Sequence, residues 1–177
     1  MKDNKLESLK DIAIFEITLL EEEFNLILDA NKKKKPKGKF TDYVFLNDTD
    51  KYKMLYEKRK DRKYASITVE IYSIIEQLLK DIHQVYLIKP FQKNHKKNIL
   101  LDLQEKLGGH LNFISNKTYN LAMIRNYIVH ENFSFKKARI DKDLEGKSKE
   151  VLSGLFKEAL EFIKNIKNIE NEIKIAP

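Results

Sequence analysis

Residues 121–132, LAMIRNYIVHEN, combine regularly spaced apolar side chains with arginine, asparagine and histidine. At about 100° per residue, Leu121, Ile124 and Ile128 fall within roughly 60° of one another, which predicts a helix with one core-facing stripe. Apolar residues also occur on the other side, and a helix that is apolar nearly all round is usually buried on more than one side. We therefore expect a second surface to cover it, most simply that of an identical chain.

The polar residues of this segment suit chemistry on a phosphodiester. Asn126 and His130 are four residues apart and share the face that points away from the apolar stripe. Arg125 lies at the edge of that stripe. Arginine offers a permanently charged fork of donors to phosphate oxygens, and histidine exchanges a proton near neutral pH. In RNA, histidine can deprotonate the 2′-hydroxyl or protonate the leaving oxygen, while arginine stabilises the charge that develops on the phosphate. One histidine cannot be acid and base at once, so a symmetric dimer would supply the second.

Residues 125–130, RNYIVH, resemble the Arg-Asn-x-x-x-His signature of the HEPN superfamily. These small all-helical domains occur in prokaryotic toxins, abortive-infection proteins and RNA-guided defence nucleases. The earlier stretch IYSIIEQLLK, residues 71–80, is similar to a HEPN helix in which an acidic residue lies among apolar ones. The resemblance implies metal-independent endoribonuclease activity across a dimer interface. It also implies a toxin or antiviral abortive-infection function, with an antitoxin or another regulatory protein as a further partner.

Carried over to this chain, the family motif assigns four site residues. Arg125 and His130 become the catalytic pair, Asn126 a positioning residue and Glu76 an orienting acid. Spacing alone also admits structural roles, because a histidine in the last turn of a helix often only complements the helix dipole, and Glu76 can pair with a nearby lysine. Many relatives carry glycine directly after the histidine, whereas this chain has Glu131.

Composition narrows the class of protein. With 177 residues, of which 42% are hydrophobic, we expect a single domain, residues 1–177, with one core. No segment approaches the roughly 18 uncharged residues of a membrane span, and Glu16 interrupts the apolar run of residues 12–20, so we expect neither a signal peptide nor a membrane partner. The lack of cysteine excludes disulfides and thiolate zinc sites and is typical of a cytoplasmic protein. We expect no metal and no cofactor, since the histidines lack ligand spacing and no glycine-rich phosphate loop occurs.

The formal net charge of +7 favours a polyanionic partner, which we predict to be RNA. Candidate contacts are basic residues that alternate with aromatic rings, because single-stranded bases stack on such rings. They are Lys58, Arg59, Arg62, Lys63, Lys136 and Lys137. A second interpretation stays open, since tyrosine rings often only pack and a lysine-rich chain can reflect an AT-rich coding sequence. The lysine-rich segment of residues 32–39 is either a solvated loop or a nonspecific phosphate contact.

Hydrophobic periodicity outside the motif predicts further helices and no strand. The predicted ranges are 5–32, 52–63, 64–86 and 94–107, followed by the motif helix from residue 115 or 116 and a final helix capped by Ser148. The helix over 64–86 has apolar residues on both sides, which predicts a central position. In the first helix the inward residues are expected to be Leu6, Leu9, Ile12, Ile17 or Leu20, Phe24 and Leu28. Residues 131–137 are expected to form a turn, followed by a charged loop.

We therefore expect an all-α, HEPN-like bundle of about five to six helices that forms a two-fold homodimer. The leading function is metal-independent endoribonuclease activity. One alternative is a catalytically silent HEPN-like module that binds RNA or a protein partner. Another is an unrelated basic helical domain that binds nucleic acid through residues 58–63 and the lysine-rich segment of residues 32–39.

Overall fold

The computed structural model describes residues 2–33, 49–87, 116–131 and 133–166. All regular structure within these ranges is α-helical, which confirms the all-α class. The helices are α1 (Lys2–Lys33), α2 (Thr49–Leu87), α4 (Asn116–His130), α5 (Phe135–Asp141) and α6 (Ser148–Asn165). The helix predicted over 94–107 and nearly all of the lysine-rich segment lie outside the described residues. No helix in the described part is both long and apolar enough to cross a membrane.

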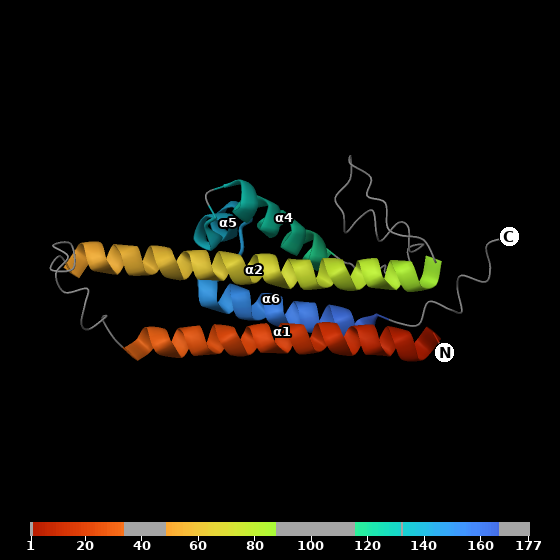
Figure 1. Ribbon diagram of the computed structural model, residues 1–177. Helices are drawn as coiled ribbons and strands as arrows, with labels where there is room; N and C mark the ends of the chain where they lie inside the picture. Colours follow the sequence, from red (N-terminus) through yellow and green to blue (C-terminus); the bar gives the residue numbers. More distant parts are fainter. Residues whose placement is uncertain (1, 34–48, 88–115, 132, 167–177) are drawn as a thin grey trace.

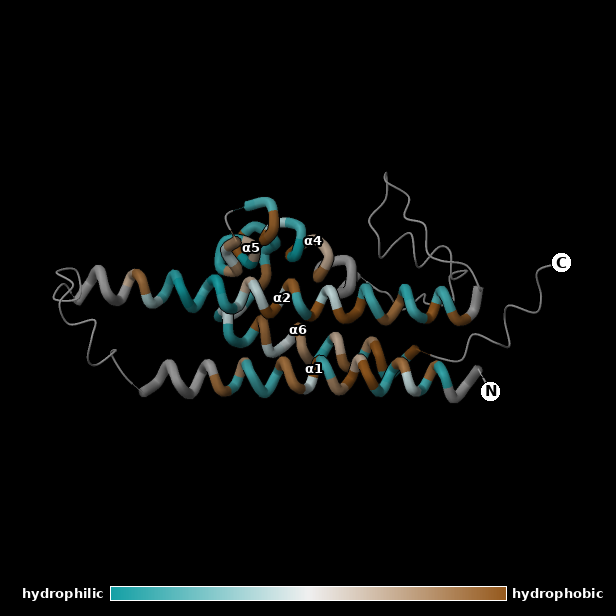
Figure 2. Tube along the Cα trace, in the orientation of Figure 1, coloured by the Kyte–Doolittle hydropathy of each residue, from teal (hydrophilic) through white to brown (hydrophobic). Residues whose placement is uncertain are grey.

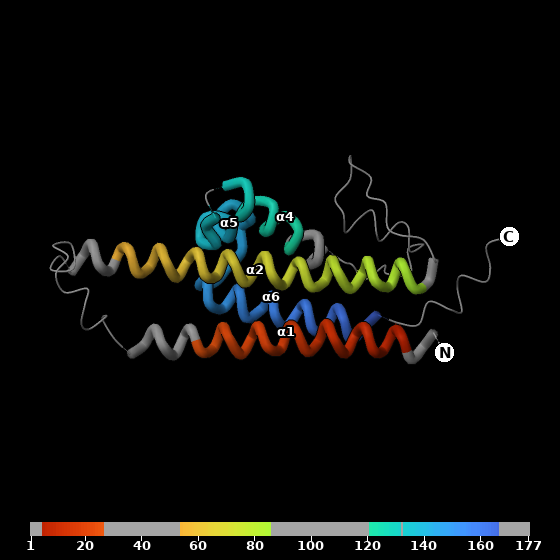
Figure 3. The backbone as a smooth tube through the Cα atoms, in the orientation of Figure 1, coloured from red at the N-terminus to blue at the C-terminus, as the bar shows by residue number. Residues whose placement is uncertain are grey.

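Helix α2 is the central element of the bundle. It contacts each of the other four described helices, with α4 and α5 on one side and α1 and α6 on the other (Figure 1). The two long helices, α1 and α2, lie side by side and antiparallel (Figure 3). The central position predicted for residues 64–86 is therefore confirmed, and the apolar residues on both sides of this helix have partners within the same chain.

The N-terminal half of α2 corrects one prediction. Residues 52–63 and 64–86 were expected as two helices, whereas the structure has one continuous helix, Thr49–Leu87. Residues 52–86 contain neither proline nor glycine, so no residue ends the helix at the expected boundary. Tyr64 and Ala65, at the expected boundary, are both buried and extend the core-facing stripe along the same helix.

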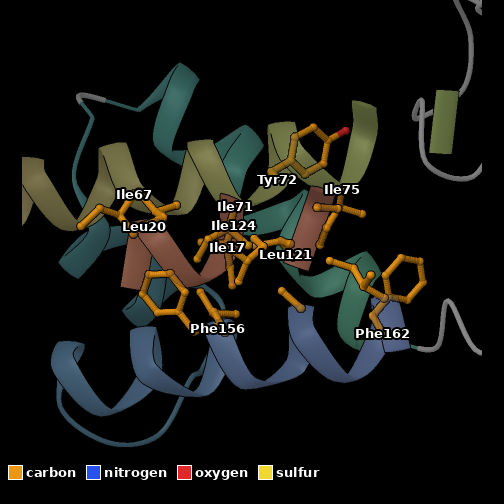
Figure 4. Close-up of a cluster of buried hydrophobic side chains, with 14 of the residues drawn as sticks. Ile17, Leu20, Ile67, Ile71, Tyr72, Ile75, Leu121, Ile124, Phe156 and Phe162 are labelled. Atoms are coloured by element: carbon orange, nitrogen blue, oxygen red, sulfur yellow. The ribbon is translucent and has the colours of Figure 1, made fainter. Parts of the chain in front are cut away.

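The core lies where α1, α2, α4 and α6 meet. Figure 2 shows hydrophobic segments concentrated on the facing sides of the helices, and Figure 4 shows the side chains themselves. Ile17, Ile71 and Ile124 are fully buried and come from three different helices. Burial of a side chain of this size contributes about 1.5–3 kcal/mol each, so helices of such different lengths are held mainly by this shared interior.

The inward face of α1 differs from the predicted one by a single position. Ala13, Ile17 and Leu20 are buried, whereas Ile12 is 55% exposed, so its predicted inward position is wrong. Neighbouring helical residues are about 100° apart, and the face that contains Ala13 and Ile17 turns Ile12 toward solvent. Leu28 was also predicted to face inward, but its side chain lies outside the described part of the structure.

The last two helices differ from the prediction, since α5 was not predicted and α6 begins at a different residue. Residues 135–141 were expected to be a turn and loop, but they form α5, which buries Phe135 and Ala138. Ser148 was expected to cap the last helix, whereas Lys147 is the cap residue and Ser148 begins α6. The Lys147 backbone N–H donates to Glu150 Oε2 at 2.9 Å, so a glutamate one turn into the helix fixes this end.

Candidate functional site

Helix α4 presents the motif with the predicted orientation. Leu121, Ile124 and Ile128 are 4%, 0% and 0% exposed, which confirms the core stripe. The helix ends at His130, and beyond it the backbone N–H of Phe133 donates to the carbonyl of Ile128 at 3.1 Å. Phe133 has a φ of +52°, a left-handed conformation that turns the chain away from the helix axis. His130 therefore lies exposed at the carboxyl end of α4.

Arg125 is held by one residue of its own helix and one of α2. Its Cζ lies 5.2 Å from the centroid of the Tyr72 ring, and its Nη1 donates to Asn126 Oδ1 at 3.0 Å. The Arg125 Nε is buried and has no hydrogen-bond partner among the described residues. Within the described chain no carboxylate forms an ion pair with Arg125. Among the described residues, the guanidinium is thus positioned by an aromatic ring and an amide and by no acid.

Tyr72 connects Arg125 to Glu76. Its side chain is buried, and burial, followed by the negative charge of Glu76, raises the pKa of Tyr72 above its ordinary value. The positive charge of Arg125 acts in the opposite direction and is outweighed. Glu76 also accepts a hydrogen bond from Lys80 Nζ at 2.5 Å on the same helix. Glu76 and the motif arginine thus both interact with the same tyrosine.

Sequence reasoning named Arg125, Asn126 and Glu76, and the structure brings these three into one cluster through Tyr72. Tyr72 itself was missed as a site residue, although its place on the same helical face as Glu76 was a usable signal. His130 lies apart from the Arg125 contact, because residues five apart on a helix are separated by about 140° around the axis and about 7.5 Å along it. No described side chain forms a hydrogen bond or ion pair with the His130 imidazole.

The predicted RNA contacts divide into two groups. Lys58 and Lys136 line a cavity of about 600 Å³ between α2, the start of α5 and the start of α6. The exposed side chains of Arg59, Arg62, Lys63 and Lys137 are not part of its lining. The cavity also contains Lys60, which belongs to the basic segment of residues 58–63, and two lysines that the sequence did not single out, Lys147 and Lys149.

A scan against models of protein families finds no match to this chain, and searches of curated proteins and of solved structures find none either. The described residues contain no group of three or more histidine, aspartate or glutamate side chains placed to hold a metal ion. The site therefore consists of one guanidinium, one amide, one phenol and one carboxylate in a single cluster, with the exposed imidazole of His130 apart from it on the same helix.

Proposed function

We propose that this chain is a metal-independent endoribonuclease of the HEPN type. The observation that carries the proposal is the state of Arg125, whose guanidinium rests on the Tyr72 ring and on Asn126 with no carboxylate bound to it in the described chain. An arginine with a purely structural role commonly ends in an ion pair. A cation held by an aromatic face and a neutral amide keeps its charge available for an anion.

The roles follow from what each group can donate. Arg125 binds a phosphodiester oxygen and stabilises the charge that develops on it, and its buried Nε–H is a further donor without a partner in the described residues. Asn126 fixes the direction of the guanidinium through its Oδ1. His130, exposed to solvent, exchanges the proton of the 2′-hydroxyl or of the leaving oxygen. Glu76 and Tyr72 act on Arg125 as positioning residues.

A two-fold dimer is part of this proposal. Arg125 and His130 of one chain point in directions about 140° apart, so a single copy does not direct both at one phosphate. Two copies of α4 related by a two-fold axis supply two arginines and two histidines to one interface. Val129, which is 43% exposed beside His130, gives that interface an apolar contact.

The biological setting is proposed from the resemblance to HEPN proteins. A cytoplasmic ribonuclease of this type restrains growth as a toxin or as an antiviral abortive-infection effector. Its activity requires control, which an antitoxin or another regulatory protein would supply. RNA is the substrate class because its 2′-hydroxyl provides the internal nucleophile that a metal-free mechanism needs.

The test is cleavage of labelled single-stranded RNA and transfer RNA in excess EDTA. We expect discrete products with the parent protein and none with His130→Ala or Arg125→Ala, while circular dichroism shows unchanged helix content. Lys157→Ala, a change at an exposed position of α6, serves as the matched control and should cleave like the parent. Retained cleavage in His130→Ala would contradict the mechanism. Intact RNA binding with no cleavage by the parent would favour the silent module instead.

A further inference from the structure

A second cluster of cations lies around Tyr64, away from the Arg125 contact. The cavity of about 600 Å³ is lined by residues of α2, α5 and α6, and five of its nine lining residues are lysines. These are Lys58, Lys60, Lys136, Lys147 and Lys149. Two carboxylates, Glu57 and Asp61, complete the charged lining, so the cavity has a net positive charge. Such a concave cationic surface concentrates anions.

Both carboxylates of the lining already have partners. Asp61 Oδ2 accepts from Ser134 Oγ at 2.6 Å, and Asp61 Oδ1 accepts from the Lys136 backbone N–H at 2.7 Å. Glu57 lies 3.6 Å from Lys60 Nζ. No ion pair within the described residues involves the ammonium groups of Lys58, Lys136, Lys147 or Lys149. The unneutralised charge in this cavity is therefore positive.

Hydrogen bonds fix two walls of the cavity. Asp61 ties α2 to the first turn of α5 and so sets the position of Lys136. Arg139 Nη1 donates to the carbonyls of Leu144 at 3.0 Å and Gly146 at 2.6 Å, directly before Lys147. These bonds reduce the ordering that a ligand would have to impose on the backbone around the cavity.

Tyr64, which lines the cavity, carries a buried donor without a partner among the described residues. Tyr64 is 1% exposed, and its hydroxyl has no hydrogen-bond partner among the described residues. Ring contacts with Phe24 at 5.5 Å and Phe135 at 6.0 Å hold the phenol in place. Burial, and then the negative charge of Glu57 across the cavity lining, raise the pKa of Tyr64, so the hydroxyl remains protonated. A buried donor left unsatisfied costs about 1–3 kcal/mol, which a ligand oxygen would recover.

The start of α6 contributes further donors. Ser148 and Lys149 line the cavity in the first turn of this 18-residue helix, where backbone N–H groups have no intrahelical partner. The cap residue is Lys147, whose ammonium group is a donor only and cannot satisfy them. The cavity thus combines ammonium groups, a phenol and a helix amino terminus, and a ligand that matches all three is an anion with several acceptor oxygens.

We propose that this cavity binds a phosphate group of the RNA backbone, at a position separate from Arg125 and His130. The exposed lysines Lys58, Lys136, Lys147 and Lys149 suit a polyanion that continues beyond the cavity, while Tyr64 and the start of α6 hold one phosphate inside it. The identification of the polyanion as RNA rests on the proposed function. The phosphate site itself rests on the residues of the cavity.

The test measures affinity for a labelled 12-nucleotide single-stranded RNA at several salt concentrations, using full-length His130→Ala so that no cleavage occurs. The double variant Lys136→Gln/Lys149→Gln removes two cavity charges, and Lys157→Gln/Lys164→Gln removes two exposed charges of α6 outside the cavity. We expect the cavity variant to bind about tenfold more weakly with a salt slope lower by about one, and the control to bind within about twofold of the parent. Equal losses in both variants would overturn the proposal.

Tyr64→Phe provides a second readout that does not change charge. The substitution keeps the ring contacts and removes only the hydroxyl. We expect affinity for RNA to fall about threefold to tenfold with an unchanged salt slope, because one neutral donor to the phosphate is lost. Unchanged RNA affinity in Tyr64→Phe would show that the buried hydroxyl has no role in binding and would overturn this part of the site.

Further experiments identify the source of the phosphate and test the ribonuclease activity and the phosphate site independently. Inorganic phosphate and adenosine monophosphate are titrated as competitors, and we expect competition only at millimolar concentrations. Tight binding of either one, with RNA affinity unchanged in the lysine variant, would reassign the cavity to a small phosphate ligand and overturn the RNA proposal. If the His130-containing parent does not cleave RNA but the cavity variants still weaken binding, the proposed activity fails while the phosphate site stands. If the parent cleaves RNA but the cavity variants bind RNA as tightly as the parent, the proposed activity stands and the phosphate site fails.

Discussion

Two buried tyrosines on α2 each lie beside a cation, and the surroundings of the two differ. At Tyr72 the cation is the guanidinium of Arg125, 5.2 Å from the ring centroid, and the phenol has Glu76 as a partner. At Tyr64 the cation is Lys60, 5.9 Å from the ring centroid, and the phenol has no hydrogen-bond partner in the described residues. The two tyrosines are eight positions apart, which corresponds to about 12 Å along the helix.

This difference separates two kinds of phosphate recognition. The Arg125 contact holds one rigid, planar cation in a fixed direction, which suits a role at a single reacting phosphate. The lysine cavity around Tyr64 gathers several flexible point charges, which suits affinity for a chain of phosphates. We therefore expect changes at Arg125 to act mainly on the rate of cleavage and changes in the cavity to act mainly on binding.

Arg125→Lys should break this comparison most strongly. The charge is kept but the planar fork is lost, so we expect single-turnover cleavage at saturating RNA to slow by about 10²-fold to 10³-fold, while the dissociation constant changes less than about threefold. The Lys136→Gln/Lys149→Gln variant should show the opposite pattern, with weaker binding and a nearly unchanged rate at saturation. A loss of affinity in Arg125→Lys as large as its loss of rate would contradict the division of roles.

Asp61→Asn tests whether the cavity wall is fixed as firmly as the hydrogen bonds suggest. The carboxylate of Asp61 accepts from Ser134 Oγ and from the Lys136 N–H at the start of α5, so we expect unfolding in urea to become easier by about 1–2 kcal/mol. Asp81→Asn is the matched control on the same helix, because among the described residues Asp81 accepts only from Gln77, one turn away on an exposed surface. It should cost at most about 0.5 kcal/mol. Equal effects would show that the Asp61 contact adds nothing beyond a local helix pair.

The periodicity of apolar residues was sufficient to predict which faces of α4 and α2 are buried. The buried stripe of α4 and the two-sided burial of α2 follow from apolar spacing within one segment, which a sequence displays directly. The short helix α5 was missed because it buries only Phe135 and Ala138, too few residues to establish a period. The division of residues 52–86 into two helices was wrong because a change from basic to apolar composition does not interrupt a helix.

The contacts that define the sites depend on residues far apart in the chain. Asp61 and Ser134 are 73 residues apart, and no local pattern predicts their hydrogen bond. The same holds for the position of Arg125 over Tyr72 and for the meeting of Lys58 with Lys149 in one cavity. The motif named Arg125 and Asn126 from six consecutive residues, whereas the role of Tyr72 beside Arg125 and the buried hydroxyl of Tyr64 became visible only through packing.

The smallest expected effect concerns alkaline pH and compares the two tyrosines directly. The pKa values of Tyr72 and Tyr64 are both raised in the folded protein, chiefly by burial, whereas an unfolded tyrosine titrates near about 10. Above that pH the unfolded chain loses protons that the folded chain keeps, so stability is fully present below about pH 10 and is lost as the pH rises further.

Urea unfolding of the parent, Tyr72→Phe and Tyr64→Phe between pH 8 and pH 11 measures this loss. Each phenylalanine variant should lose about 1 kcal/mol less than the parent over the interval, because one group that titrates earlier in the unfolded state is gone. At pH 8 the two should diverge, since Tyr72→Phe removes a hydroxyl that interacts with Glu76 and Tyr64→Phe removes a donor that has no partner in the described residues. We expect Tyr72→Phe to be the less stable of the two there. If Tyr64→Phe were instead the more destabilised, the Tyr64 hydroxyl would already have a hydrogen-bond partner within the chain. The proposed contrast between Tyr72, which interacts with Glu76, and Tyr64, whose hydroxyl is free to bind a ligand, would then be wrong.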